Sequence, residues 1–197
     1  MLKHCLAALA VVLLFGCTQK QRHLKFGTVR DNPISSDHLI VPGQSIGDIS
    51  LNENADSVFK VLGKPDSSDA AMGKMVATWF KRHDTTTYET QVFFTRQMGT
   101  ADEASRVSEI RVTSPDFKTA NYLGTGVTGQ SIIEKYNFNL VKAAQYKVDS
   151  KRFFIFDDVV AGISFEINDK RICTGIIVHE PNENSTAQYL AFHTKMK

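Results

Sequence analysis

The apolar residues form one unbroken run near the N-terminus and, after it, many short periodic segments. The run covers residues 6–15 (LAALAVVLLF), and Lys3 precedes it. A membrane-spanning helix needs about 20 apolar residues, whereas a shorter run behind a basic residue is typical of a secretory signal peptide. The pattern therefore predicts an exported protein.

A first short helix is predicted over residues 51–63 (LNENADSVFKVLG). Asn52 or Asn54 can cap its start, Gly63 can take the left-handed conformation of a helix end, and Pro65 prevents continuation. Its apolar face consists of Val58, Phe59 and Leu62.

A second short helix is predicted over residues 128–137 (TGQSIIEKYN), with Asn137 in the place of Gly63. Its apolar face consists of Ile132, Ile133 and Tyr136. Aligning the two helix ends gives a shift of 74 residues. The tetrapeptide Gly-Gln-Ser-Ile, at residues 43–46 and 129–132, would require a shift of 86. We interpret this match as a coincidence, because the order of elements is the physical constraint.

Strands are predicted after each helix. The segments are 74–81, 88–96 and 106–113 after the first helix, and 144–148, 151–156, 160–167 and 171–179 after the second. Residues 168–170 (NDK) predict a hairpin turn. Antiparallel strands after isolated helices predict an α+β fold. We expect two repeats, over residues 39–115 and 116–197, each a short helical segment packed on an antiparallel β-meander.

Four apolar residues do not fit the core face predicted for these strands. They are Phe93, Phe154, Phe156 and Ile177. Either a second layer or the other repeat covers them, or they form an exposed sheet face that binds a protein partner.

The end of the apolar run, Leu14-Phe15-Gly16-Cys17, resembles the lipobox of bacterial lipoproteins. Phe15 departs from the motif, since a smaller residue is usual there. We expect residues 1–16 to be a lipoprotein signal peptide that is cleaved before Cys17, whose thiol and amine are then acylated, for example with palmitate. The alternative is an ordinary secreted protein with a chance cysteine.

Residues 17–38 are polar and predict a flexible tether. No aspartate follows Cys17, and the sorting rules of the lipoproteins that it resembles then imply the periplasmic face of the outer membrane. The expected partners are the lipid bilayer, through acylated Cys17, and an envelope protein.

The net charge and the cysteines argue against a nucleic-acid partner and against a disulfide-stabilised fold. Lys+Arg number 23 and Asp+Glu 21, a formal charge of +2, which argues against a nucleic-acid partner. Cys5 is lost with the signal peptide and Cys17 is acylated, so Cys173 remains alone and the mature chain has no intrachain disulfide. Because Cys173 lies in a predicted strand, we expect a buried, inert thiol.

This organisation resembles a family of bacterial envelope lipoproteins with one or two units of the SmpA/OmlA (BamE-like) type, also described as β-lactamase-inhibitory-protein-like. The matching segments are 42–47 (PGQSIG), 49–51 (ISL), 62–66 (LGKPD), 124–126 (GTG), the helix at 131–136 and 162–165 (GISF). The resemblance implies helices packed on an antiparallel sheet and a protein-binding role. It carries over no binding residue, because the shared positions are caps, turns and core.

Residues 43–47 (GQSIG) match G-x-S-x-G, in which Ser45 would be a nucleophile. Asp157 or Asp158, and then His179 or His193, follow in hydrolase order. Pro42 interrupts any strand before Ser45, and the alternating β/α pattern of hydrolases is absent. We therefore interpret the motif as a turn with positive-φ glycines.

Residues 124–129 (GTGVTG) match G-x-G-x-x-G before a helix, and Asp149 lies 20 residues further on. A dinucleotide site also needs a buried strand entering the loop and a long crossover helix. Neither is predicted, so we expect no cofactor.

The remaining polar residues predict no metal site. The histidines of the mature chain, His23, His38, His83, His179 and His193, lack ligand spacing. Residues 184–186 (NST) form a sequon, interpreted as a polar loop in a bacterial protein.

Taken together, these patterns predict a non-catalytic protein-binding or structural module. The alternatives are a serine hydrolase that uses Ser45, or a small-ligand or lipid carrier.

Overall fold

A computed structural model describes residues 33–99, 101, 103–136 and 139–185. The chain divides into two compact units, residues 1–32 and 33–197, and the described residues all belong to the second. They form two short α-helices and two sheets, so the α+β class is confirmed. The predicted signal peptide, Cys17 and most of the tether lie outside the described residues. Neither described helix is long and apolar enough to cross a membrane.

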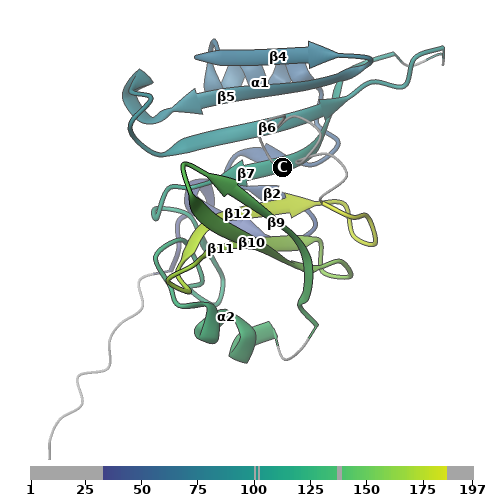
Figure 1. The fold of residues 1–197 in the computed structure, drawn as a ribbon. Helices are drawn as coiled ribbons and strands as arrows, with labels where there is room; N and C mark the ends of the chain where they lie inside the picture. Colours follow the sequence, from purple (N-terminus) through teal and green to yellow (C-terminus); the bar gives the residue numbers. More distant parts are fainter. Residues whose placement is uncertain (1–32, 100, 102, 137–138, 186–197) are drawn as a thin grey trace, which may run out of the picture. The chain divides into compact units, whose positions relative to one another are not determined.

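The large sheet has eight antiparallel strands in the order β4-β5-β6-β7-β12-β11-β10-β9 (Figure 1). Their bounds are β4 Ser67–Ala71, β5 Lys74–Phe80, β6 Glu89–Thr95, β7 Arg106–Val112, β9 Val141–Val148, β10 Lys151–Asp158, β11 Ile163–Asn168 and β12 Cys173–His179. Four consecutive strands follow each helix, and the last strands of the two groups pair with each other. In that β7–β12 pair, Glu109 lies opposite His179 and Val112 opposite Ile176.

A small mixed sheet in the order β3-β2-β1-β8 packs on the same side as the helices. Its strands are β1 Leu39–Val41, β2 Ser45–Ile46, β3 Ile49–Ser50 and β8 Lys118–Thr119, with β1 and β8 parallel. Two 3₁₀ turns, η1 Ser36–His38 and η2 Lys81–His83, complete the described elements. None of these short strands is predicted from the sequence.

Both helices are eight residues long and lie 74 residues apart, the shift predicted from their ends: α1 is Ala55–Leu62 and α2 is Gly129–Tyr136. The start of α1 differs from the prediction because Asn52 has φ +61°, which interrupts a helix. Asn54 is the cap, and its Oδ1 accepts the Asp56 N–H at 2.8 Å. Gly63 has the expected positive φ (+76°), but ψ of −164° is extended rather than left-handed helical.

In the large sheet the predicted strands are present with shifted ends, and β4 is the one strand not predicted. β9 begins at Val141 rather than residue 144, and β11 at Ile163 rather than 160. β4 was missed because its sequence, SSDAA, is polar and every residue is exposed. Pairing with β5 alone defines this edge strand.

The large sheet is buried on both faces. The main core lies on the helix side and includes Val58 and Ile132. A second cluster on the other face contains Phe93, Tyr146, Ile155 and Ile177, from β6, β9, β10 and β12. Strands β9 and β10 cross in front of β7 and β12 in Figure 1, so the sheet curls over this second face. Phe93 and Ile177, two of the four unexplained apolar residues, are therefore covered by the sheet itself.

Candidate functional site

Ser45 lies in the short strand β2 and is followed by β3 rather than by a helix. The flanking glycines have the positive φ expected of turns, +66° for Gly43 and +54° for Gly47. Gly43 donates its N–H to the Gly162 carbonyl at 3.1 Å, which fastens the turn to the loop before β11. A nucleophile elbow requires strand, sharp turn and helix, and this segment is a hairpin.

Asp157 and His179, two of the hypothetical triad residues, are hydrogen-bonded to each other. His179 Nε2 lies 2.9 Å from Asp157 Oδ1. Two hydroxyl groups donate to the same carboxylate, Ser164 to Oδ1 at 2.8 Å and Ser185 to Oδ2 at 3.4 Å. The structure thus surrounds Asp157 with serines, but Ser45 is not one of the residues bonded to this cluster.

The Asp157 cluster has the wrong connectivity and access for nucleophilic catalysis. In a hydrolase triad the imidazole lies between the hydroxyl and the carboxylate, whereas here the carboxylate lies at the centre. All four side chains are at most 1% exposed, so no substrate reaches a hydroxyl. The alternative residue Asp158 accepts the Ala161 N–H at 3.0 Å, and His193 lies outside the described residues.

Glu109 of β7 faces the Asp157 cluster from the neighbouring part of the sheet. Its Oε2 is buried and has no hydrogen-bond partner among the described residues. Burial raises the pKa of Glu109 well above its ordinary value, and the charge of Asp157 raises it further, whereas Lys74 opposes the change. A protonated Glu109 therefore fits this site better than a carboxylate.

A buried ion-pair network lies beside Glu109 on the same face. Arg111 donates two hydrogen bonds to Glu166 Oε2, at 2.9 and 2.7 Å, and also pairs with Glu89. The Tyr146 hydroxyl donates to the other Glu166 oxygen. Gly175 makes this possible, because a Cβ there would lie 2.0 Å from Glu166 Oε2. These groups satisfy one another, so we assign them to the core.

The G-x-G-x-x-G segment, residues 124–129, is not arranged to hold a phosphate. The Gly126 N–H is donated to the Cys173 carbonyl and the Gly129 N–H to the Arg171 carbonyl, each at 2.8 Å. A phosphate loop needs free amides pointing at the ligand. These amides instead fasten the loop to β12 and the start of α2 to the turn before β12.

The other sequence candidates are structural or isolated. Cys173 is 1% exposed in β12, and burial raises the pKa of its thiol to about 12. His83 Nδ1 lies 2.7 Å from Asp66 Oδ1 on the surface, and the His38 ring packs beside Phe117. Among the described residues, no three His, Cys, Asp or Glu side chains are grouped to hold a metal ion.

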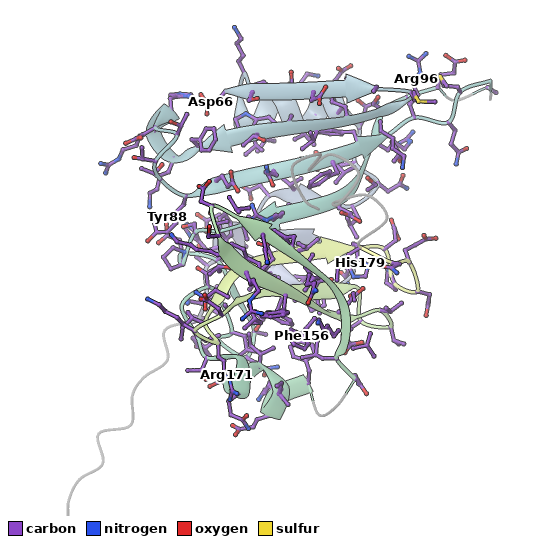
Figure 2. The ribbon with its side chains drawn as sticks, in the orientation of Figure 1. Asp66, Tyr88, Arg96, Phe156, Arg171 and His179 are labelled. Atoms are coloured by element: carbon purple, nitrogen blue, oxygen red, sulfur yellow. The ribbon has the colours of Figure 1, made fainter. Side chains whose placement is uncertain are left out.

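The strongest candidate for a binding site is a groove of about 690 Å³ beside α2, called the α2 groove below. The helix forms one wall, and strands β9, β10 and β11 with the β11–β12 turn form the rest. Its apolar lining consists of Ile132, Ile133, Leu140, Phe154, Phe156, Phe165, Ile167 and Ile172. In Figure 2, Phe156 and Arg171 both lie on the α2 side of the molecule.

Basic side chains dominate the polar rim of the α2 groove. They are Lys142, Arg152, Lys170 and Arg171, against one acidic residue, Asp169. None of the four forms an ion pair with a described residue. Lys142 Nζ lies 4.9 Å from the centroid of the Phe154 ring, a cation–π contact. An apolar floor under unpaired cations favours a ligand with both apolar and anionic parts.

The groove is open because α2 fills less space than α1. In α1, Phe59 packs against Trp79 and Phe94, with ring centroids 6.0 and 5.8 Å apart. The residue 74 positions later is Ile133, which is 40% exposed at the groove rather than part of the core face as predicted. A smaller side chain at this position therefore leaves the strand residues beneath it uncovered.

Sequence reasoning missed this site, although it singled out two of its residues. Phe154 and Phe156 do not fit the core face predicted for their strand, and both line the α2 groove. The rim cations come from three separate segments, so no local motif brings them together.

The comparisons assign no family. No protein-family model matches the chain, and no curated protein matches it. A DUF4309 family protein (YjgB) from Bacillus subtilis is similar in structure: it is 12% identical, the match covers 70% of this chain and 88% of that one, and the TM-score is 0.42.

Proposed function

We propose that the protein is a lipid-anchored, non-catalytic binding module of a bacterial envelope, with the α2 groove as its binding site. This proposal rests on one observation: solvent reaches the α2 groove but does not reach the Asp157 cluster. The groove is open, apolar and rimmed by cations that form no ion pair with a described residue, whereas the Asp157 cluster, which most resembles a catalytic site, is sealed from solvent. Ligand sites are typically concave, largely apolar and equipped with a few polar groups.

The anchor part of the proposal rests on residues 14–17 (LFGC). Acylated Cys17 would hold the folded part at the periplasmic face of the outer membrane by the tether of residues 17–38. Cys17→Ser should abolish palmitate incorporation and release the protein from membranes. Retention of the label in this variant would contradict the proposal.

We also propose that the fold consists of two repeats, residues 39–115 and 116–197, as in the envelope lipoproteins of the SmpA/OmlA (BamE-like) type. A helix followed by four antiparallel strands occurs twice, and the helices lie 74 residues apart. The repeats would meet at β7 and β12, which are antiparallel, as a two-fold relation between them requires. This arrangement supports the proposal that the α2 groove is a specialisation of one repeat.

The binding site can be tested by photocrosslinking in living cells. A photoreactive amino acid at Ile133, on the groove, should give an adduct in the envelope fraction. The same amino acid at Met72, which is 92% exposed between β4 and β5, is the matched control and should give none. An adduct at Met72 alone, or the absence of any protein or lipid adduct at both positions, would contradict the assignment of the groove.

The absence of catalysis has its own test. A fluorophosphonate probe that labels active serines should not label the protein. Labelling that disappears in Ser45→Ala would restore the hydrolase hypothesis.

A further inference from the structure

Resting on the proposed α2 groove, we propose that its occupant is a single-chain anionic amphiphile of the fatty-acid type. The alkyl chain would lie on the aromatic floor of the groove, and the carboxylate would lie at the cluster of basic residues on its rim. Three observations lead to this occupant: the shape of the groove, the position of its basic residues and the sequence of the chain's C-terminal segment.

The shape fits a small ligand with a long apolar part. A volume of about 690 Å³ lies in the middle of the range of roughly 300–1,000 Å³ typical of small-molecule sites. Phe154, Phe156 and Leu140 are half-buried on the floor, while Phe165 and Ile167, which lie beside Phe156 and Phe154 on the neighbouring strand β11, are buried. Half-buried aromatic side chains keep apolar surface in water, which a bound alkyl chain would cover.

The charges are concentrated at one end of the groove. Lys170 and Arg171 belong to the β11–β12 turn, and Arg152 lies beside that turn because its neighbour Phe153 pairs with Asn168. Lys142 is further along, opposite Phe156 in the β9–β10 register. Three cations around one acidic residue, Asp169, provide a place for a carboxylate, and the apolar floor runs from there toward Leu140.

The C-terminal sequence of the chain does not match this occupant. Residues 186–197 (TAQYLAFHTKMK) contain an apolar stretch, but their charged residues are Lys195 and Lys197, which the basic rim would repel. The sequence of residues 186–197 is therefore a poor match for the basic rim.

Binding is measured with the chain from residue 17 onward carrying Cys17→Ser, so that its own acyl groups do not compete. The probes are saturated fatty acids of 8 to 16 carbons, used below their aggregation limits, and hexadecanol is the uncharged control. The binding of each probe is measured by its displacement of a fluorescent fatty acid from the protein. Each buried methylene should lower Kd by up to about fourfold. Hexadecanol should bind more weakly than hexadecanoate.

Two variants separate the roles of charge and space. Arg152→Gln with Arg171→Gln should weaken hexadecanoate binding by about three- to tenfold and leave hexadecanol binding unchanged, because only the carboxylate uses these cations. Lys60→Gln, an exposed cation on α1, is the matched control and should change neither. Ile133→Trp should block both ligands by filling the groove. Unchanged circular dichroism spectra would show that the variants are folded.

The outcomes distinguish this inference from the proposed function. Equal affinity for the acid and the alcohol, or no dependence on chain length, would overturn the fatty-acid assignment. If fatty acids do not bind but position 133 crosslinks to an envelope protein, the occupant is a protein and the groove assignment remains. If neither a fatty acid nor a crosslinked partner is found, both proposals are wrong.

Discussion

Glu109 makes the stability of this protein depend on pH in a way that one substitution should remove. The side chain is 2% exposed, and its Oε2 has no hydrogen-bond partner among the described residues. Asp157 of β10, His179 opposite it on β12 and Lys74 of β5 are the charged or titratable groups that face it. Glu109→Gln keeps the shape of the side chain and removes its charge at every pH.

The sign and size of the effect follow from the raised pKa of Glu109. In the unfolded chain the carboxyl loses its proton near pH 4.5, whereas the folded protein retains it to higher pH. Above pH 4.5 the folded state therefore binds more protons, and the free energy of unfolding falls by up to about 1.4 kcal/mol per pH unit. Between pH 5 and pH 7 the loss reaches up to about 2.7 kcal/mol, a large part of the stability of an ordinary domain. The loss stops once the pH exceeds the folded-state pKa.

Urea unfolding, followed by the fluorescence of Trp79, measures this effect. Trp79 is the single tryptophan of the chain and is buried in β5, so its emission reports global unfolding. The stability of Glu109→Gln relative to wild type should increase from pH 5 to pH 7, because all other titrations are shared and cancel. Glu183→Gln, at an exposed loop position, is the control and should stay parallel to wild type. A Glu109→Gln curve parallel to wild type would refute the reasoning.

Three further predictions address the core. Arg111→Met should lower the free energy of unfolding by about 3–5 kcal/mol, since it leaves a buried carboxylate unpaired; a loss below about 1 kcal/mol in chemical denaturation would argue against a buried pair. Gly162→Ala should destabilise the protein more than Gly99→Ala in the same assay, because both have positive φ but only at 162 would a Cβ meet the His179 carbonyl oxygen, at 2.4 Å. Cys173 should resist a thiol reagent at pH 8 in the native state and react in urea, as its raised pKa and burial require; rapid native labelling would show that β12 opens.

The helices and most strands were predictable because their signals are local. Capping at Asn54, the positive φ of Gly63 and the alternation along β11 depend on neighbouring residues alone. The tetrapeptide Gly-Gln-Ser-Ile shows the limit of such signals. At 43–46 it forms a turn and β2, whereas at 129–132 it begins α2. The surrounding residues, and not the tetrapeptide, decide between the two conformations.

The candidate site could not be predicted in the same way, because it depends on packing between distant segments. The groove exists because Ile133 covers less of the strands than Phe59 does in α1, which a sequence pattern cannot measure. The burial of Phe93 and Ile177 likewise depends on the curl of the sheet. Asp157 and His179 are two of the four residues that the sequence offers as triad partners of Ser45, and only their burial and mutual hydrogen bond show that they belong to the core.

The β7–β12 pair also sets the order in which the chain can complete its sheet. Strands β4 to β7 are consecutive and can pair with one another before the rest of the chain has folded, but the free edge of β7 must wait for β12. β12 is the last strand of the second group, so this edge stays open until nearly all described residues are present. An unpaired edge is a template for intermolecular pairing. A chain truncated before β12 should therefore exchange or aggregate through β7, and the speed with which β12 pairs with β7 would control the yield of the native fold.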